Sequence, residues 1–264
     1  MTGAGQSRYV RDTVSEYDAT VAAYAATRRP DPRIAAVIER ALGEARSVVN
    51  VGAGAGSYES PEREVIAVEP SAAMRAQRPA GAPAPIDAQA EALPLADDSA
   101  DAAMAILTVH HWQDPAAGLR ELRRVARGPV VVFTWDPDEV DAFWLVREYL
   151  PEIARSDQAR FPAIDTISAT LGGEVAVDRV PIPHDCRDGF LGAFWRRPER
   201  YLEAAVRPGI SSFRDVEPAV LERALAKLRN DLDSGAWRRH YGGLLSRDEL
   251  DLGYRLVVAH PRVG

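Results

Sequence analysis

The sequence of 264 residues contains one cysteine, Cys186, and one lysine, Lys227. A single cysteine excludes an intramolecular disulfide and any CxxC metal or cluster site. Schiff-base chemistry would depend on Lys227 alone, and that residue lies in a polar stretch with helical spacing. The composition therefore disfavours both thiol-based and lysine-based chemistry.

An excess of positive charge is also missing, because the formal net charge is −7 at pH 7. Nucleic-acid-binding proteins usually present a basic face, so we expect no nucleic-acid partner. The longest apolar runs, Ala102–Val109 and Val130–Phe133, are far shorter than the roughly 20 residues of a membrane helix, and the N-terminus lacks a signal-peptide pattern. We expect a cytoplasmic protein with no membrane partner.

The order of apolar segments predicts a Rossmann-like α/β fold with a doubly wound, mostly parallel sheet. Two helices come first: one carries Tyr17 and Tyr24 on its apolar stripe, and the second begins after Asp31 as N-cap and ends at Gly43. A later helix begins at Asp114-Pro115. Strands are expected at Ser47–Val51, Val65–Glu69, Ala84–Ala88 (weakly), Ala102–Thr108 and Val130–Trp135.

The second half of the chain is expected to be more helical. Helices are predicted over Val140–Ile153 and Ala163–Leu171, and strands at Val175–Ile182 and Tyr254–His260. The stretch between these strands, Asp185–Asp251, is too long for a structureless loop and has its own helical periodicity. We therefore predict a core of residues 1–184 and 252–264, with an inserted helical cap over 185–251 that covers the acceptor site.

A glycine-rich turn follows the first predicted strand, with glycines at Gly52, Gly54 and Gly56. Such a turn lets the backbone approach a ligand closely at the carboxyl edge of the sheet. A dinucleotide site would have its third glycine at the position of Ser57 and a longer crossover to the next strand. The pattern favours a cofactor without phosphates. Glu69, at the end of the second strand, can accept both ribose hydroxyls, although NAD sites use the same contact.

Three segments, VVNVGAGAGSYE, VIAVEPSAAM and AEALPLADDSADAAMAILTVHHW, resemble the class I methyltransferases of the UbiE-like, type 11 group, and YRLVVAH resembles their last strand. The resemblance implies S-adenosylmethionine as cofactor. It implies that Gly52, Ala53, Gly54 and Gly56 lie under the amino acid portion, that Glu69 and Pro70 lie at the ribose, and that Gln89, Ala90 and Glu91 lie beside the adenine.

Two parts of the chain depart from this pattern or extend it. The adenine loop usually follows Gly-Asp, but Ala88-Gln89 stands here, and Asp87 is a shifted alternative. Upstream, Tyr24 and Arg28 resemble a Y…Y…RP pattern that closes over the methionine moiety and its carboxylate. The alternative for both Tyr17 and Tyr24 is that they are only the buried stripe of the first helix.

Methyl transfer needs the nucleophile held in line with the methyl group and a base where a proton must leave. His110 and His111 are the base candidates because they end a buried strand, where ligands bind. Strand alternation would point the two imidazoles in opposite directions, so at most one is expected to face the cleft; the alternative is simple packing. Trp112, Trp144 and Trp195 are candidate acceptor contacts, although such residues are more often core.

No metal site is predicted, because Asp114 is explained as a helix N-cap and no cluster of ligands stands out. The leading hypothesis is methyl transfer to a small, partly apolar acceptor through oxygen, nitrogen or carbon. A protein that binds S-adenosylmethionine without methyl transfer, and an NAD-dependent oxidoreductase, remain as alternatives. The acceptor, the attacked atom and the oligomeric state do not follow from the sequence.

Overall fold

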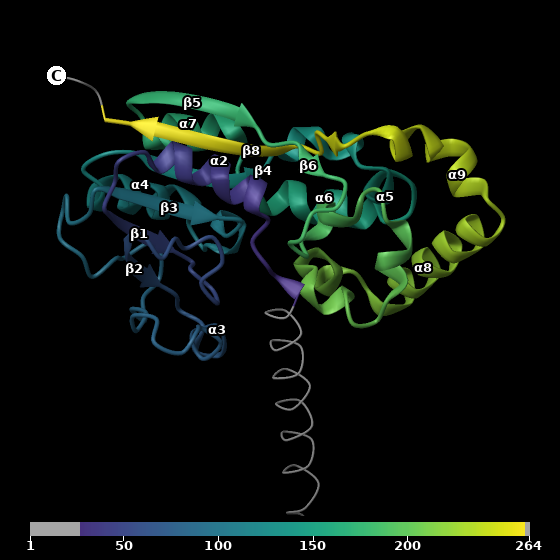
Figure 1. The fold of residues 1–264 in the computed structure, drawn as a ribbon, viewed down its shortest axis with the longest axis horizontal. Coiled ribbons are helices and arrows are strands. Elements are labelled where there is room, and N and C mark those ends of the chain that lie inside the picture. The colour runs from purple at the N-terminus through teal and green to yellow at the C-terminus, as the bar shows by residue number, and fades with distance from the viewer. Residues whose placement is uncertain (1–26, 262–264) are drawn as a thin grey trace, which may run out of the picture.

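The computed structural model describes residues 27–261 as a sheet with flanking helices, followed on one side by a layer of helices (Figure 1). The predicted helix with Tyr17 and Tyr24 lies outside these residues. In Figure 1 the sheet occupies the left half and helices α5, α6, α8 and α9 the right half. The site lies where sheet edge and helical layer meet.

One six-stranded sheet forms the core, in the order β2-β1-β3-β4-β8-β5. β1 to β4 run parallel, β8 is antiparallel to β4, and β5 is antiparallel to β8. The mostly parallel sheet is thus confirmed. Its strands are β2 (Glu64–Val68), β1 (Ser47–Val51), β3 (Ala102–Ile106), β4 (Val130–Trp135), β8 (Tyr254–His260) and β5 (Glu174–Arg179).

The predicted third strand, Ala84–Ala88, is reduced to a single parallel bridge between Ile86 and Val68. Ile86 still exchanges hydrogen bonds with β2, because its N–H donates to Ala67 and its carbonyl accepts from Glu69. Pro85 inside this segment and Pro83 just before it lack the N–H that a ladder requires. The chain therefore passes the sheet edge without forming a strand.

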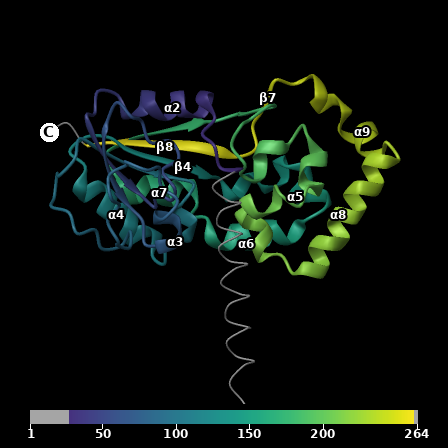
Figure 2. The same cartoon turned by 60° about the horizontal axis from the view of Figure 1, so that its bottom comes forward.

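Helices cover both faces of the sheet. α2 (Pro32–Leu42) begins at the N-cap Asp31 and ends at Gly43, as predicted, and buries Ile34, Ile38 and Leu42. α4 (Pro115–Val125), capped by Asp114, and α7 (Ile164–Leu171) lie together on the other face (Figure 2). The short α3 (Ala72–Arg75) follows β2.

The prediction of one helix over Val140–Ile153 is wrong. The chain forms η2 (Pro137–Ala142), α5 (Trp144–Glu148) and α6 (Pro151–Arg160) instead. Pro151 has no N–H to donate and disfavours helical backbone at the preceding residue, so α5 stops and α6 starts there. This break directs α6 toward the carboxyl edge of the sheet.

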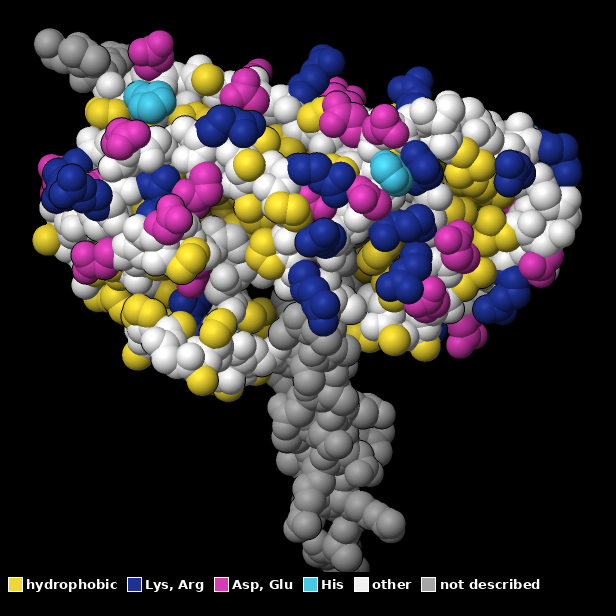
Figure 3. Space-filling model, viewed as in Figure 1, with side chains coloured by type: hydrophobic (Ala, Val, Ile, Leu, Met, Phe, Trp, Pro, Cys, Tyr) yellow, Lys and Arg dark blue, Asp and Glu magenta, His cyan; other side chains and the backbone are white. Residues whose placement is uncertain are grey.

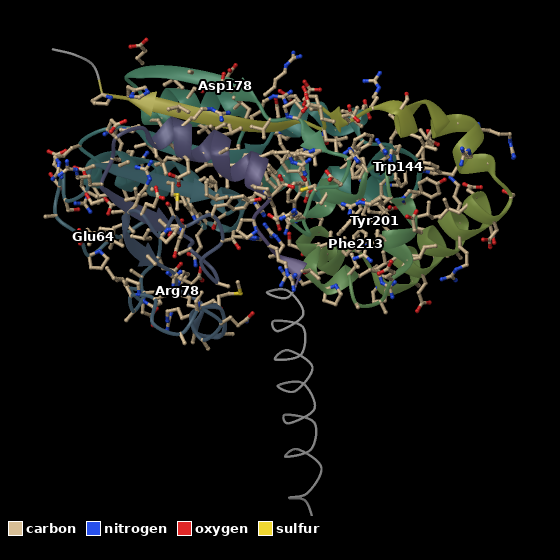
Figure 4. All side chains as sticks on the ribbon, viewed as in Figure 1. Glu64, Arg78, Trp144, Asp178, Tyr201 and Phe213 are labelled. Atoms are coloured by element: carbon tan, nitrogen blue, oxygen red, sulfur yellow. The ribbon has the colours of Figure 1, made fainter. Side chains whose placement is uncertain are left out.

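The helical layer combines α5 and α6 with the segment predicted as a cap. Trp144 of α5 contacts Tyr201 and Trp237 edge-on, and Figure 4 shows Trp144, Tyr201 and Phe213 within this layer. Strands β6 (Ile182–Pro183) and β7 (Glu249–Leu250) pair at its base. Its other elements are η3 (Leu191–Phe194), η4 (Pro198–Leu202), η5 (Arg207–Gly209), η6 (Ser211–Asp215), α8 (Pro218–Asp233), α9 (Ala236–Tyr241) and η7 (Gly242–Ser246).

Charged side chains of both signs are interspersed over the face shown in Figure 3, with hydrophobic side chains between them. None of the helices within residues 27–261 combines the length and apolar character that a membrane crossing requires.

Candidate active site

The carboxyl ends of β1, β2 and β3 open into a cavity of about 610 Å³, here called the cofactor cavity. This volume is typical of sites for small organic ligands, which span about 300–1,000 Å³. Its walls bring together residues predicted from separate motifs: Arg28, Gly52, Ala53, Gly54, Glu69, Pro70, Gln89, Ala90, His111 and Trp112.

The glycine turn forms one wall of this cavity and requires glycine at its first position. Gly52 has φ of +70°, and a Cβ there would overlap the Thr108 side chain at the end of the neighbouring chain segment. Gly54, with φ of +54°, leaves only 3.2 Å between a virtual Cβ and the Met74 methyl carbon. Left-handed backbone and close packing together explain why side chains are absent here.

Glu69 presents a buried carboxylate to the cofactor cavity and is only 7 % exposed. Its Oε2 accepts the N–H of Gly54 at 2.8 Å, and its Oε1 accepts the N–H of Ser71 at 2.8 Å. Each carboxylate oxygen can accept a further hydrogen bond. The side chain is thus held in place by backbone donors, and both of its oxygens retain the capacity to accept from a ligand.

The predicted adenine loop divides into lining and supporting residues. Gln89 and Ala90 line the cavity, whereas the Glu91 carboxylate accepts the N–H groups of Gln113 and Asp114 at 2.7 and 3.0 Å. Asp87 is not in the lining of the cavity formed by residues 27–261 and pairs with Arg75. Gln89, not Asp87, is therefore the polar side chain available at this end.

Trp112, which the sequence suggested as an acceptor contact, lines the cofactor cavity beside this loop. Within residues 27–261 it is not in the lining of the smaller neighbouring cavity described below. Its ring lies against Gly118 of α4, where a Cβ would overlap the indole. Gly56 does not line the cavity formed by residues 27–261; it lies against the paired side chains of Glu59 and Arg78.

Three side chains that sequence reasoning missed support the glycine turn. Asn50, the one polar residue inside β1, lines the cavity and donates from Nδ2 to Glu59 at 2.9 Å. Arg78 in turn holds the Glu59 carboxylate through two contacts of 2.9 and 2.6 Å. A polar residue within an apolar strand was the signal available in the sequence.

Arg28 lines the cofactor cavity, as predicted, and forms a buried ion pair. Its Nε donates to Asp188 at 2.6 Å, and Asp188 is fully buried. Tyr58, at φ of +63° in the glycine turn, donates its hydroxyl to the same carboxylate at 2.9 Å, and burial raises the pKa of that phenol. Asp188, in the segment 185–251, thus connects this segment to Tyr58 at the end of the glycine turn. Tyr24 lies outside the described residues.

A second, smaller cavity of about 50 Å³ adjoins the first and is here called the aromatic cavity. Arg28, Leu107 and His111 line both cavities, so they form a shared wall. Leu107 has φ of +50°, a backbone conformation that costs a leucine free energy and is typical of functional sites. The remaining lining comes from β4, the helical layer and the start of β8.

The prediction that His110 and His111 point in opposite directions is wrong. β3 ends at Ile106, and both histidines lie in the 3₁₀ turn η1 (Val109–His111), where side-chain alternation no longer applies. Their ring centroids are 3.9 Å apart, and both rings line the aromatic cavity.

Both imidazoles are neutral near pH 7. Part of the His111 side chain is exposed, yet the surrounding protein lowers its pKa to about 4, first through burial and then through the positive charge of Arg214. Burial, with a smaller contribution from His111, holds the pKa of His110 well below its usual value. A neutral imidazole can accept a proton, which a protonated one cannot.

Trp144 and Trp195, predicted as acceptor contacts, lie in the buried core of the helical layer. The Trp144 indole donates to the Trp195 carbonyl at 2.8 Å, and the Trp195 indole donates to Ile182 at 2.9 Å. Within residues 27–261, neither side chain lines the cofactor cavity or the aromatic cavity. The alternative interpretation, that they are core residues, agrees with these positions.

Comparison with known proteins places this geometry in a family. A methyltransferase domain model matches residues 49–132, and no curated protein matches the chain. The solved structure of a candidate methyltransferase from an antibiotic biosynthesis pathway of Anabaena variabilis is 34 % identical, with a TM-score of 0.81 over 88 % of this chain and 98 % of that one.

More distant structures share the fold. An S-adenosylmethionine-dependent methyltransferase of Thermotoga maritima is 18 % identical, with a TM-score of 0.51 over 97 % of both chains. Phosphoethanolamine N-methyltransferase 2 of Haemonchus contortus, solved with S-adenosylmethionine, is 13 % identical, with a TM-score of 0.57 over 93 % of this chain and 57 % of that one. The chain belongs to the class I methyltransferases, and S-adenosylmethionine is its cofactor.

Proposed function

We propose that this methyltransferase acts on a small, partly apolar acceptor, which the aromatic cavity holds while the cofactor cavity holds S-adenosylmethionine. The observation that carries the proposal is the shared wall, because Arg28, Leu107 and His111 line both cavities. An acceptor atom at this wall would be within reach of a methyl group on the other side.

The cofactor would be held mainly by backbone and by Glu69. The glycine turn would lie under its amino acid portion, the Glu69 carboxylate would accept the ribose hydroxyls, and Gln89 and Trp112 would contact the adenine. Polar groups positioned before binding add affinity because they need no reorganisation. When bound, S-adenosylmethionine supplies an activated methyl group on a sulfonium.

His111 would accept the proton of an oxygen or nitrogen acceptor. In the transfer, the acceptor lone pair forms the new bond to the methyl carbon, and the electrons of the broken carbon–sulfur bond go to sulfur, which becomes a neutral thioether. The acceptor proton passes to the imidazole and then to solvent. The lowered pKa of His111 keeps the imidazole neutral near pH 7 but also makes it a weaker base, so its place on the wall shared by both cavities is what supports this role.

The segment 185–251 would act as a cap over the acceptor. Phe190, Leu191, Ser211 and Ser212 of this segment contribute to the lining of the aromatic cavity. The ion pair of Asp188 with Arg28 ties the same segment to the chain just before α2. Both contacts support a closed pocket for a small molecule.

Release of S-adenosylhomocysteine from a panel of small neutral alcohols, phenols, anilines and heterocyclic amines tests the proposal. Once an acceptor is identified, His111→Gln should lower kcat by at least about 100-fold, which is the lower end of the range for loss of a general base. Its Kd for S-adenosylhomocysteine should stay within about twofold. His240→Gln, on an exposed histidine of α9, is the matched control.

Two outcomes would contradict the proposal. One is turnover of proteins or nucleic acids with none of the small molecules. The other is a His111→Gln variant with unchanged kcat, which would remove the assigned base. Tight cofactor binding without any methyl release would favour the alternative in which the protein binds S-adenosylmethionine without transfer.

A further inference from the structure

Aromatic side chains make up much of the lining of the aromatic cavity. Phe161 stacks on the His110 ring, with centroids 4.1 Å apart and planes 16° from parallel. The Trp135 ring contacts Phe161 edge-on, with centroids 5.4 Å apart and an angle of 78° between the ring planes. Phe143, Phe190 and Tyr254 complete the aromatic lining. Such surfaces favour a planar ring, which can adopt stacked and edge-on contacts with them.

The volume of the aromatic cavity limits the size of its ligand. The cavity measures about 50 Å³, below the roughly 150 Å³ of a cavity that binds benzene. A six-membered ring therefore fits only where it extends across the shared wall into the cofactor cavity. A fused ring system or a long chain would need its walls to move apart.

Charged groups at the aromatic cavity already have partners of opposite charge. Asp157 accepts from Arg160 at 3.0 Å and from Ser212 at 3.2 Å, and Arg28 is paired with Asp188. A cationic amine or an anionic acid would lose its hydration without gaining a free counter-charge. The cavity therefore favours a neutral ligand.

One polar atom of a lining residue lacks a hydrogen bond. Nδ1 of His110 is buried, so it does not face the cavity in this conformation, and it has no partner among residues 27–261. An unmade hydrogen bond of this kind costs free energy, which a hydroxyl or amino group on the ligand would recover once a rotation of the imidazole turned this nitrogen toward the cavity. The strained Leu107 adjoins it on the shared wall, where the transferred methyl group would arrive.

We infer that the acceptor is a neutral, single-ring aromatic compound that carries a hydroxyl or amino group. This inference rests on the proposed function, because it takes the aromatic cavity as the acceptor site. The ring lies against the Phe161–His110 stack, and the oxygen or nitrogen of its polar group accepts a hydrogen bond from Nδ1–H of His110 while its own proton faces His111. This oxygen or nitrogen is the atom that receives the methyl group.

Binding to the protein saturated with S-adenosylhomocysteine tests the inference without turnover. Calorimetry compares 4-methylphenol with 4-methylcyclohexanol, which has the same heavy atoms on a puckered ring, and with toluene, which lacks the hydroxyl. The phenol should bind about 3- to 10-fold more tightly than the cyclohexanol, the range expected for aromatic contacts. It should bind about fivefold more tightly than toluene, as expected for one hydrogen bond. 4-Methylbenzoate and 4-methylbenzylamine should bind more weakly than the phenol.

Two variants separate stacking from hydrogen bonding. Phe161→Leu should remove the preference for the flat ring over the puckered one. His110→Phe keeps a ring in the stack, so it should retain that preference but lose the preference for 4-methylphenol over toluene. Phe194→Leu, on a buried aromatic residue outside the lining formed by residues 27–261, is the control and should retain both preferences. All three should bind S-adenosylhomocysteine as the wild type does.

The inference is overturned if 4-methylcyclohexanol or either charged compound binds as tightly as 4-methylphenol, or if none of the ring compounds binds. It is also overturned if Phe161→Leu leaves the ring preference unchanged. Should the rings bind as expected while only other compounds are methylated, the placement of methyl transfer at this cavity fails instead. Methylation of aliphatic alcohols without phenol binding would retain the proposed function and refute the aromatic acceptor.

Discussion

Replacing Glu69 by glutamine tests the ribose contact while it keeps the shape of the side chain. The carboxylate is 7 % exposed, and each of its oxygens accepts one backbone N–H at 2.8 Å. Loss of a hydrogen bond to a charged group costs about 1.5–3 kcal/mol. One such contact with the ribose therefore corresponds to an increase in Kd of about 10- to 150-fold.

The same substitution has a second, separable effect on stability. The glutamine amide carries one oxygen and one NH₂ group, so its NH₂ must face the N–H of either Gly54 or Ser71. A buried donor left without an acceptor costs about 1–3 kcal/mol, and the free energy of unfolding should fall by that amount. Chemical denaturation measures this loss, and calorimetry with S-adenosylhomocysteine measures the affinity.

Glu64→Gln is the matched control for Glu69→Gln. Glu64 begins the same strand, β2, at its opposite end and is exposed (Figure 4). Its replacement should leave the Kd for S-adenosylhomocysteine within about twofold. If Glu69→Gln is folded and its Kd is within threefold of the wild-type value, Glu69 does not hold the ribose.

Three further perturbations test the site. The added methyl group of Gly52→Ala would overlap Thr108, so this variant should lose about 1–3 kcal/mol more stability than Gly81→Ala, because Gly81 also has a positive φ but has open space around its Cβ position. Thermal unfolding compares the two variants, and equal losses would contradict the packing argument. Asp188→Ala removes the buried carboxylate that pairs with Arg28 and should lower the free energy of unfolding, measured with denaturant, by about 3–5 kcal/mol. A decrease below 1 kcal/mol would refute the role of this ion pair. Because the folded pKa of His111 is about 4 and the unfolded value near 6.5, unfolding stability should fall as pH drops through this window. The acid limb of kcat/KM for a phenol acceptor should then lie near pH 4, and a midpoint near 6.5 would contradict the lowered pKa of His111.

Elements with strong local signals appear where the sequence predicts them. α2 begins at Pro32, directly after its N-cap Asp31, and ends before Gly43. The cap and the fixed φ of proline act at its first turn, and the positive φ of the glycine acts at its last. β4 and β8 match their predicted bounds, since each is an apolar run covered on both faces. In these segments local preference and tertiary packing agree.

Elements that depend on tertiary context are predicted less well. The apolar periodicity over Val140–Ile153 continues through Pro151, and the hydrophobic pattern outweighed the helix break in that prediction. The strand predicted over Ala102–Thr108 ends at Ile106, although the apolar run continues to Val109. Apolar character alone does not show where backbone pairing stops.

The cofactor cavity is more predictable than the aromatic cavity for a physical reason. Gly52, Gly54 and Glu69 lie within 18 positions of one another at the ends of adjacent strands, so one motif specifies both backbone shape and charge. Phe161, Phe190 and the other lining residues of the aromatic cavity come from distant segments. No spacing rule relates such residues, and only the packing of the helical layer brings them together.

The turn at Leu107 connects these two halves. Its N–H still donates to the Phe133 carbonyl at 2.7 Å, so the ladder between β3 and β4 is retained while φ becomes positive. A continued strand would send the side chains of His110 and His111 to opposite faces of the sheet. The 3₁₀ turn instead brings both imidazoles to the aromatic cavity and leaves His111 on the wall shared with the cofactor cavity. A positive φ at one residue, which costs about 1–3 kcal/mol, thus accompanies the turn that brings two neutral imidazoles to the aromatic cavity.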